Sequence, residues 1–324
     1  MHETRTLALV SRQNPSRPQI ALLRRPAAAL SLLGLFLVGC GTPFATRDHL
    51  TLSAPRPADS LVVDNSVGRI TVKADPAATE VKAEIIKIGK GCNQHEADQA
   101  VADIEVSLAN ADGVVRAEAR HPGGTGIRGY EVQWQITAPP DVDIDVTNDV
   151  GDLHISGFQK NISLKNDVGD AVVIADSADG EPGGEVKVTT GVGSIRADNA
   201  RNGLTATTDV GNIFALAGGP VDLRSNVGSV SLKLLPTTAD TVKLATDVGD
   251  VRIYLTPEQQ GSILADCDVG DVRLSIDDAK IKTLRERRHH CTAQLGESRT
   301  PAIDLTSDVG DIRIGSFDPA AAAK

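Results

Sequence analysis

The sequence predicts an all-β protein built as a parallel β-solenoid, in which the chain winds into a stack of similar coils. Three observations lead to this expectation. After residue 39 the dipeptide Val-Gly recurs nine times, apolar residues stand at fixed offsets on both sides of each of these glycines, and aromatic residues make up only 2% of the chain. A repeat near twenty residues is typical of stacked structural units. The nine turn glycines are Gly68, Gly151, Gly169, Gly193, Gly211, Gly228, Gly249, Gly270 and Gly310.

Each coil is expected to hold two or three short strands. From Gly151 to Gly270 the glycines lie 18, 24, 18, 17, 21 and 21 residues apart, which is too short for strand–helix–strand units. Apolar residues lie seven and five positions before each glycine and two and four positions after it. This spacing predicts two strands with one buried face each, joined at the Val-Gly turn. Glycine there indicates a positive φ or a very close approach to the next coil, and the right-handed form of the solenoid is favoured.

Residues 1–39 read as a lipoprotein signal peptide. Arg24 and Arg25 precede an apolar run that ends in Leu37-Val38-Gly39-Cys40. These four residues match the bacterial lipobox, in which the cysteine, here Cys40, is lipidated and becomes the mature N-terminus. The unusually long segment before the apolar run also fits a start codon placed too early. Gly41 after the cysteine favours the outer membrane.

The charge of the chain excludes nucleic acid as a partner. The signal carries five Arg and one Glu, so its removal changes the net charge from −10 to −14. A chain this acidic repels nucleic acid and anionic lipid. We therefore expect it to be held at the membrane by its lipid, not by a basic patch.

The rest of the chain divides into four parts. Residues 40–60 are small, polar and proline-bearing, and suggest a tether. Residues 61–140 predict a β-rich N-terminal region that caps the stack, with one short helix starting at the capping box of Asn93 and Glu96. Residues 141–316 hold the regular repeats, interrupted at 277–300 by a basic insertion, so that a last coil at 301–314 completes the stack. Residues 317–324 form a tail.

Three cysteines remain after lipidation: Cys92, Cys267 and Cys291. An exported protein can hold disulfides. We pair Cys267 with Cys291, the nearer two, which flank the insertion. The alternative is that Cys267 is a buried thiol.

The lipobox, the irregular β-rich N-terminal part, the proline before the array and the repeated Asp-Val-Gly-Asp phrases resemble the putative adhesin family of bacterial envelope proteins. The resemblance covers about residues 60–315. It implies a β-solenoid domain and an adhesin-like role, and it transfers a fold more safely than an activity.

Aspartates flank the glycines in two columns, which stacking would turn into two rows of carboxylates. Like charges at this spacing repel by about 1 kcal/mol per pair in water-like surroundings. Three explanations are open: turn residues that bond their own backbone, an ion-pair ladder with Arg252, Arg273 and Arg313, or a Ca²⁺ site. The candidate ligands are Asp149, Asp152, Asp167, Asp170, Asp247, Asp250, Asp268, Asp271, Asp308 and Asp311.

Two other functions, metal binding by the insertion and catalysis, have less support in the sequence. His289-His290-Cys291 could ligate a soft metal, but a solvated basic loop is favoured because no companion cluster stands nearby. No nucleophile elbow, phosphate loop or HExxH motif is present, so we expect no enzyme and no catalytic residue.

We therefore expect an exported, lipid-anchored, adhesin-like binding or structural protein of the bacterial envelope, whose partner is an envelope or surface protein or glycan. One alternative is a periplasmic envelope-maintenance or sensing lipoprotein that binds a protein partner. A more distant one is a polysaccharide-acting enzyme.

Overall fold

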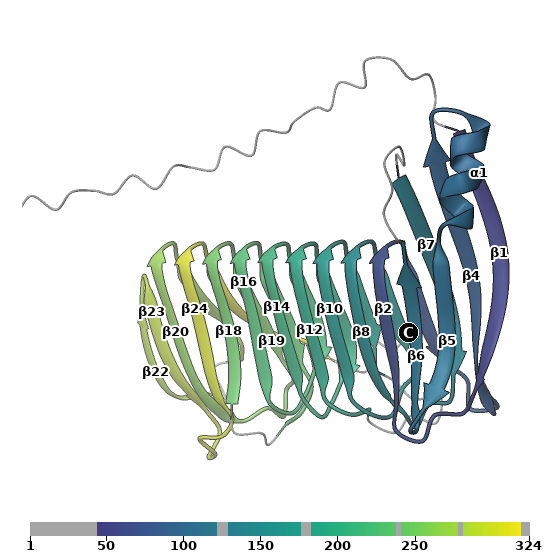
Figure 1. Cartoon of the computed structure of the whole chain (residues 1–324). Coiled ribbons are helices and arrows are strands. Elements are labelled where there is room, and N and C mark those ends of the chain that lie inside the picture. The colour runs from purple at the N-terminus through teal and green to yellow at the C-terminus, as the bar shows by residue number, and fades with distance from the viewer. Residues whose placement is uncertain (1–43, 122–128, 176–182, 238–240, 278–280, 319–324) are drawn as a thin grey trace, which may run out of the picture. The chain divides into compact units, whose positions relative to one another are not determined.

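The structure is a computed structural model that describes residues 44–121, 129–175, 183–237, 241–277 and 281–318 of the 324-residue chain. All of them belong to one compact unit, Gly41–Lys324. Within them the chain forms one short helix and strands in two large sheets, mostly parallel (Figure 1). The all-β prediction is confirmed at this level.

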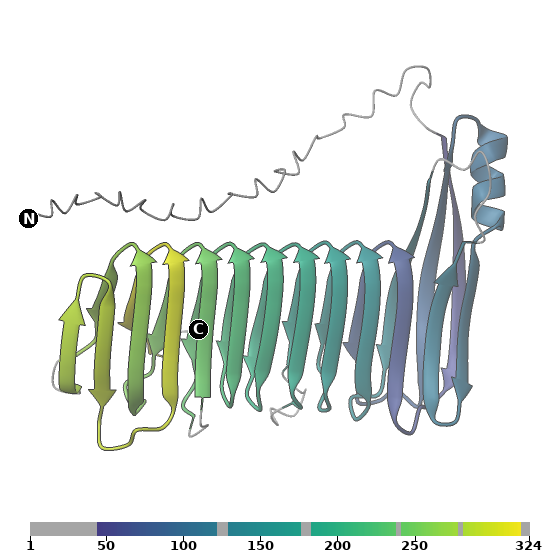
Figure 2. The same ribbon diagram turned by 60° about the vertical axis from the view of Figure 1, so that its left-hand side comes forward.

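Each repeat contributes one strand to each sheet. The strand before the glycine joins a 13-stranded sheet, and the shorter strand after it joins a 12-stranded sheet. Successive repeats pair in parallel and in register, as the neighbouring arrows of Figure 2 show. The strand pairs are β2 (Ser60–Val67) with β3 (Ile70–Ala74), β8 (Asp143–Val150) with β9 (Leu153–Ser156), β10 (Ile162–Val168) with β11 (Ala171–Ile174), β12 (Val186–Val192) with β13 (Ile195–Ala200), β14 (Leu204–Val210) with β15 (Ile213–Ala217), β16 (Val221–Val227) with β17 (Val230–Leu234), β18 (Thr241–Val248) with β19 (Val251–Leu255), β20 (Gly261–Val269) with β21 (Val272–Ser275), and β24 (Ala302–Val309) with β25 (Ile312–Ser316).

The core lies between the two sheets and follows the predicted apolar columns. Every residue seven or five positions before a repeat glycine is buried, as is every residue two positions after it. Four positions after the glycine the side chains are buried too, apart from Leu274, which is partly buried. Alternation with a period of two places these side chains on one face of each strand, so the sequence pattern alone specifies the core.

The N-terminal region extends both sheets instead of forming a separate layer. The 12-stranded sheet continues from β3 through β7 (Gly129–Ala138) and β4 (Glu80–Gly91) to β1 (Phe44–Pro55), and the 13-stranded sheet continues from β2 through β6 (Val114–Arg120) to β5 (Glu105–Ala111). The helix α1 (Gln94–Ala102) packs on β4 and β1. Asn93 is its N-cap, since its Oδ1 accepts a hydrogen bond from the Glu96 N–H at 2.9 Å.

The expectation of a tether over residues 40–60 is wrong for most of that segment. Phe44–Pro55 is a twelve-residue strand that pairs antiparallel with β4 along its whole length. Leu50 and Leu52 pack partly buried against the core, and Ala54 is buried. The strand forms because these apolar side chains alternate with polar ones and reach an edge of β4 that would otherwise be unpaired.

The order of the last coils also differs from the expectation. The final repeat, β24 and β25, does not complete the stack but lies between the repeat of β18 and β19 and the repeat of β20 and β21. The basic insertion forms a hairpin of β22 (Ile281–Arg287) and β23 (His290–Leu295), and β23 pairs antiparallel with β20. The hairpin thus covers the free edge of β20, and its outermost strand is almost wholly exposed and carries Lys282, Arg285 and Arg287. Charged side chains on an edge strand discourage pairing with another chain.

Candidate functional site

The most regular feature of the molecule is the edge where each strand of the 13-stranded sheet turns into a strand of the 12-stranded sheet. The repeat glycines stack along it. Gly228 has φ +147°, and a Cβ built on it would lie 1.9 Å from the carbonyl oxygen of Gly211 in the neighbouring repeat. Gly249 is in the same situation, with φ +150° and 2.1 Å to the Gly228 oxygen. Both reasons that the sequence suggested for glycine, positive φ and close approach, therefore apply together.

A row of buried polar side chains, three positions before each glycine, lies beneath this edge. The hydroxyl of Thr246 donates to the Gly228 carbonyl at 2.8 Å, and that of Ser307 donates to the Gly249 carbonyl at 3.0 Å. Toward the N-terminal repeats the row continues with asparagine amides, such as Asn166 Nδ2 to the Gly151 carbonyl at 2.9 Å. These bonds satisfy glycine carbonyls that the turn would otherwise leave unpaired. The row is Asn65, Asn148, Asn166, Thr190, Thr208, Ser225, Thr246 and Ser307, with Cys267 in the same position in its own repeat.

Sequence reasoning missed this row, although a signal for it was present. The residues lie on the same alternating positions as the buried columns seven and five before the glycine, so the period of two places them inside. At the N-terminal end the row is continued by Trp134, which is 2% exposed and donates from Nε1 to Asn65 Oδ1 at 3.3 Å.

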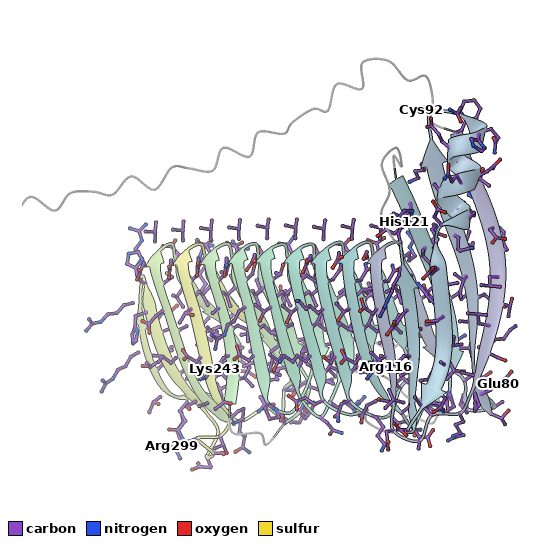
Figure 3. The ribbon with its side chains drawn as sticks, in the orientation of Figure 1. Glu80, Cys92, Arg116, His121, Lys243 and Arg299 are labelled. Atoms are coloured by element: carbon purple, nitrogen blue, oxygen red, sulfur yellow. The ribbon has the colours of Figure 1, made fainter. Side chains whose placement is uncertain are left out.

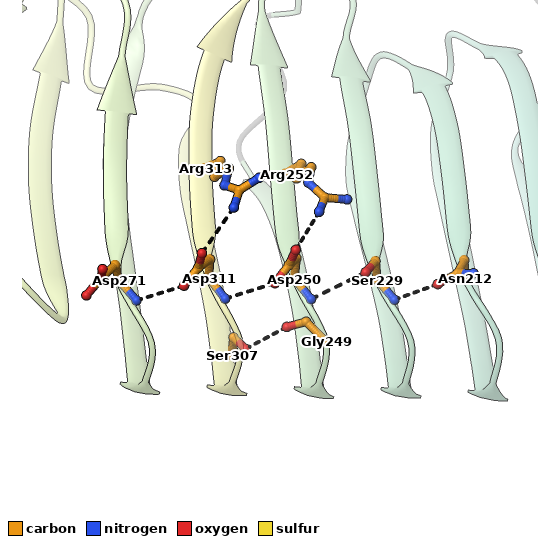
Figure 4. A network of polar contacts seen from close by, with 9 residues as sticks. All are labelled: Asn212, Ser229, Gly249, Asp250, Arg252, Asp271, Ser307, Asp311 and Arg313. Carbon is orange, nitrogen blue, oxygen red and sulfur yellow. Dashed lines mark hydrogen bonds and ion pairs between the residues drawn. The ribbon is translucent and has the colours of Figure 1, made fainter.

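The aspartates directly after the glycines bond the backbone of the next repeat. Asp250 Oδ1 accepts from the Asp311 N–H at 3.1 Å, and Asp311 Oδ1 accepts from the Asp271 N–H at 3.1 Å (Figure 4). In other repeats Asn212 and Ser229 do the same, as Figure 4 shows. This row therefore serves as turn chemistry between neighbouring coils.

Arginines offset the charge of the same row. Arg313 lies 3.1 Å from Asp311, Arg252 pairs with Asp250, and Asp271 pairs with Arg288 at 2.9 Å and with Arg273 at 3.4 Å. Hydrogen bonds from Arg288 and then Arg273 lower the pKa of the Asp271 carboxyl. The backbone N–H of Asp271, followed by Arg313, lowers the pKa of Asp311 in the same way. Turn chemistry and the ion-pair ladder thus act on the same carboxylates.

The second aspartate row, two positions before the glycines, is different. All its side chains are exposed, and within the described residues none of them makes an ion pair. They are Asp149, Asp167, Asp209, Asp247, Asp308 and Asp268, in the order in which their strands neighbour one another; Ser66, Gly191 and Asn226 occupy the position in the other three repeats.

Beside this row runs a line of exposed valines, one before each repeat glycine except Gly68, which we call the valine edge. The strand registers stack these valines on one another. Each is 45–62% exposed, although the residue type is apolar. The valine edge consists of Val150, Val168, Val192, Val210, Val227, Val248, Val309 and Val269.

The candidate metal ligands do not converge on an ion. Within the part of the chain that the structure describes, no group of three or more His, Cys, Asp or Glu side chains is placed to hold a metal. The ten aspartates proposed as Ca²⁺ ligands are split between the two rows. One row is bonded to backbone and arginine, and the other is exposed toward solvent.

The cysteines also differ from the expectation. Cys267 and Cys291 are both buried and free, so the predicted disulfide between them is absent. Cys291 lies opposite Ala265 in the β20–β23 ladder, two positions from Cys267, and such diagonal side chains are farther apart than the Cβ separation of about 3.8 Å that a disulfide needs. Burial raises the pKa of both thiols. Cys92 is disulfide-bonded.

The basic insertion is only partly the solvated loop that the sequence favoured. His289 Nδ1 lies 3.9 Å from Cys267 Sγ, and His290 pairs with Asp266 of β20. The hairpin is therefore bonded to the terminal repeat of its own chain. Other basic side chains lie on the outer face of the 13-stranded sheet, among them Arg116 and Lys243 (Figure 3).

The predicted lipidation site, Cys40, lies outside the described residues, as do the signal peptide and most of the tail. Among the residues that are described, no helix has the length and apolar character to cross a membrane.

Comparisons with known proteins give similarity to solved structures only. A putative cell adhesion protein from Clostridium sporogenes is 12% identical with a TM-score of 0.24, over 85% of this chain and 100% of that one. A putative adhesin from Bacteroides fragilis is 14% identical with a TM-score of 0.34, over 83% and 97%. A putative adhesin from Parabacteroides merdae is 10% identical with a TM-score of 0.29, over 85% and 96%. No family model and no curated protein matches the chain. Similarities this low carry no argument about fold or function.

Proposed function

We propose that the protein is an exported, lipid-anchored, adhesin-like binding protein of the bacterial envelope, and that its two sheets are the walls of a β-solenoid. The observation that carries the proposal is the valine edge beside a row of exposed aspartates that make no ion pair within the described residues. One exposed surface is repeated in eight of the nine repeats, whereas the buried polar row and the aspartates after the glycines are bonded within the fold. An apolar and acidic surface that is repeated and exposed suits binding along a length of partner.

A catalytic role has no comparable support. The carboxylates recur in most repeats instead of gathering at one place, and those after the glycines are bonded to backbone N–H groups and arginines. Catalysis needs convergent groups at one reacting centre. We therefore propose a non-enzymatic role.

The anchoring part of the proposal is tested at Cys40. Mass spectrometry of the N-terminal peptide from cells should show a lipid on the Cys40 sulfur, and Cys40→Ala should release the protein from the membrane fraction. The same sulfur cannot carry both a thioether-linked lipid and a disulfide. A Cys40 found in a disulfide, or a membrane-bound alanine variant, would overturn the anchoring.

The location is tested by treating intact cells with protease. Loss of the protein from intact cells supports an adhesin-like role at the surface. Protection until the outer membrane is opened supports the alternative, a periplasmic lipoprotein that binds a protein partner through the same edge.

A further inference from the structure

The valine edge has a composition that the turn itself does not require. A β-branched residue suits the extended backbone before the glycine, and threonine would meet that need while keeping the surface polar. Yet all nine repeats carry valine, and eight of these valines are 45–62% exposed. Three positions before the glycine, by contrast, Asn, Thr, Ser and Cys all occur. The uniform choice of an exposed apolar side chain indicates a contact surface.

The spacing of the valine edge defines what can lie along it. Neighbouring repeats are about 4.8 Å apart, so eight valines span about 34 Å. An extended peptide presents a side chain to one face about every 6.6–6.8 Å, so its side chains fall out of step with valines about 4.8 Å apart after the first one. An α-helix rises about 5.4 Å per turn, which keeps one side chain near each valine over about four turns. The spacing therefore favours a helix.

The charge of the neighbouring row defines the flank of that helix. Asp149, Asp167, Asp209, Asp247, Asp308 and Asp268 run beside the valines and make no ion pair within the described residues. A second copy of the chain would bring its own aspartates to the contact, and the net charge of −10 opposes such pairing. Anionic lipid is repelled for the same reason. Lysine or arginine beside an apolar stripe matches both rows.

From these observations we propose that the valine edge and the adjacent aspartate row bind an amphipathic α-helix with an apolar stripe and a basic flank, supplied by a partner protein. This inference rests on the proposed binding role and names the partner class. The apolar stripe of the helix covers the valines, and its basic side chains lie over the aspartates.

The test is fluorescence anisotropy of the full-length protein with a labelled 18-residue helical peptide of leucine and lysine. A peptide of the same composition, scrambled so that no apolar stripe forms, is the control for charge alone. We expect the helical peptide to bind at least about tenfold more tightly than the scrambled one, and binding to weaken with salt. Equal binding of the two peptides would overturn the proposal.

Variants locate the site. The triple substitution Val210→Thr, Val227→Thr and Val248→Thr removes apolar methyl groups from adjacent repeats without changing shape, and should weaken binding at least about tenfold. Asp209→Asn with Asp247→Asn should weaken it about threefold to tenfold and flatten its salt dependence. Phe214→Thr, an exposed apolar residue of β15, and Asp145→Asn, an exposed carboxylate of β8, are matched controls expected to stay within about twofold.

Two further outcomes separate this inference from its rivals. Concentration-dependent dimers that the triple valine variant abolishes would replace the helix by a second copy. Binding that persists in both the valine and the aspartate variants would place the helix elsewhere. Neither result bears on membrane location, which the protease and Cys40 experiments decide on their own, so failure of the inference and failure of the proposed function are distinguishable.

Discussion

Substituting one stacked glycine and two glycines outside the row should separate the two constraints, positive φ and close approach. At Gly228 both act: φ is +147° and a Cβ would lie 1.9 Å from the Gly211 oxygen. At Gly203 only the first acts, since φ is +135° but the nearest atom to a Cβ, the Pro220 oxygen, is 3.5 Å away. At Gly218 neither acts, because its φ lies outside the left-handed region and the nearest atom, the Arg201 oxygen, is 3.4 Å away.

The magnitudes follow from these distances. An alanine forced into the left-handed region costs about 1–3 kcal/mol. The overlap at Gly228 is with backbone that is held in two sheets, and such overpacking adds about 1–3 kcal/mol. We expect about 2 kcal/mol of lost stability for Gly203→Ala and about 4 kcal/mol for Gly228→Ala. Gly218→Ala should change stability by less than about 1 kcal/mol.

The assay is thermal unfolding of the purified protein, followed by far-ultraviolet circular dichroism. For a domain of this size about 1 kcal/mol lowers Tm by roughly 2–4 °C. We therefore expect Tm to fall by about 0–3 °C in Gly218→Ala, about 6 °C in Gly203→Ala and about 12 °C in Gly228→Ala. A Gly228→Ala protein no less stable than Gly203→Ala would refute the claim that close approach between coils dictates glycine.

Three other predictions concern the same edge. Thr246→Val leaves the Gly228 carbonyl without its 2.8 Å donor and should cost about 1–3 kcal/mol in urea unfolding, whereas Thr205→Val on the outer face should cost less than about 0.5 kcal/mol. Because the carboxylates after the glycines are already bonded, Ca²⁺ should not raise Tm over chelator. A Ca²⁺ site at 100 times its Kd would add about 2.7 kcal/mol, and a rise of that size would restore the cation site. Hydrogen bonds from Arg288 and Arg273 give Asp271 a lower pKa in the folded than in the unfolded protein. Its ion pairs therefore contribute their full stability above the ordinary carboxyl pKa of about 3.9, and this stability is lost as the pH falls from there through the folded-state pKa. An NMR titration should show Arg288→Gln raising the Asp271 pKa; an unchanged value would contradict the assigned cause.

The sequence by itself determined the elements that depend on local pattern. The columns around each glycine alternate with a period of two, and a strand with that pattern can bury only one face, so residues such as Ile195 and Leu223 are identified as core before any contact is known. The same alternation identifies Thr246 and the other buried polar residues as inward-facing. It also identifies Leu50, Leu52 and Ala54 of β1, although the proline-bearing composition of that segment had suggested a tether. The helix after Asn93 follows from its capping residues.

The tertiary structure alone decided which coil neighbours which. The phrases around Gly249, Gly270 and Gly310 are nearly identical, so each coil fits against either of the others, and pattern gives no reason for β24 to lie between β18 and β20. The hairpin at Ile281–Leu295 resolves the order, because it pairs with β20 and makes that repeat the terminal one. The valine edge is likewise a tertiary property. An isolated valine before a glycine has no meaning for binding, and only in-register stacking joins eight of them into one exposed surface.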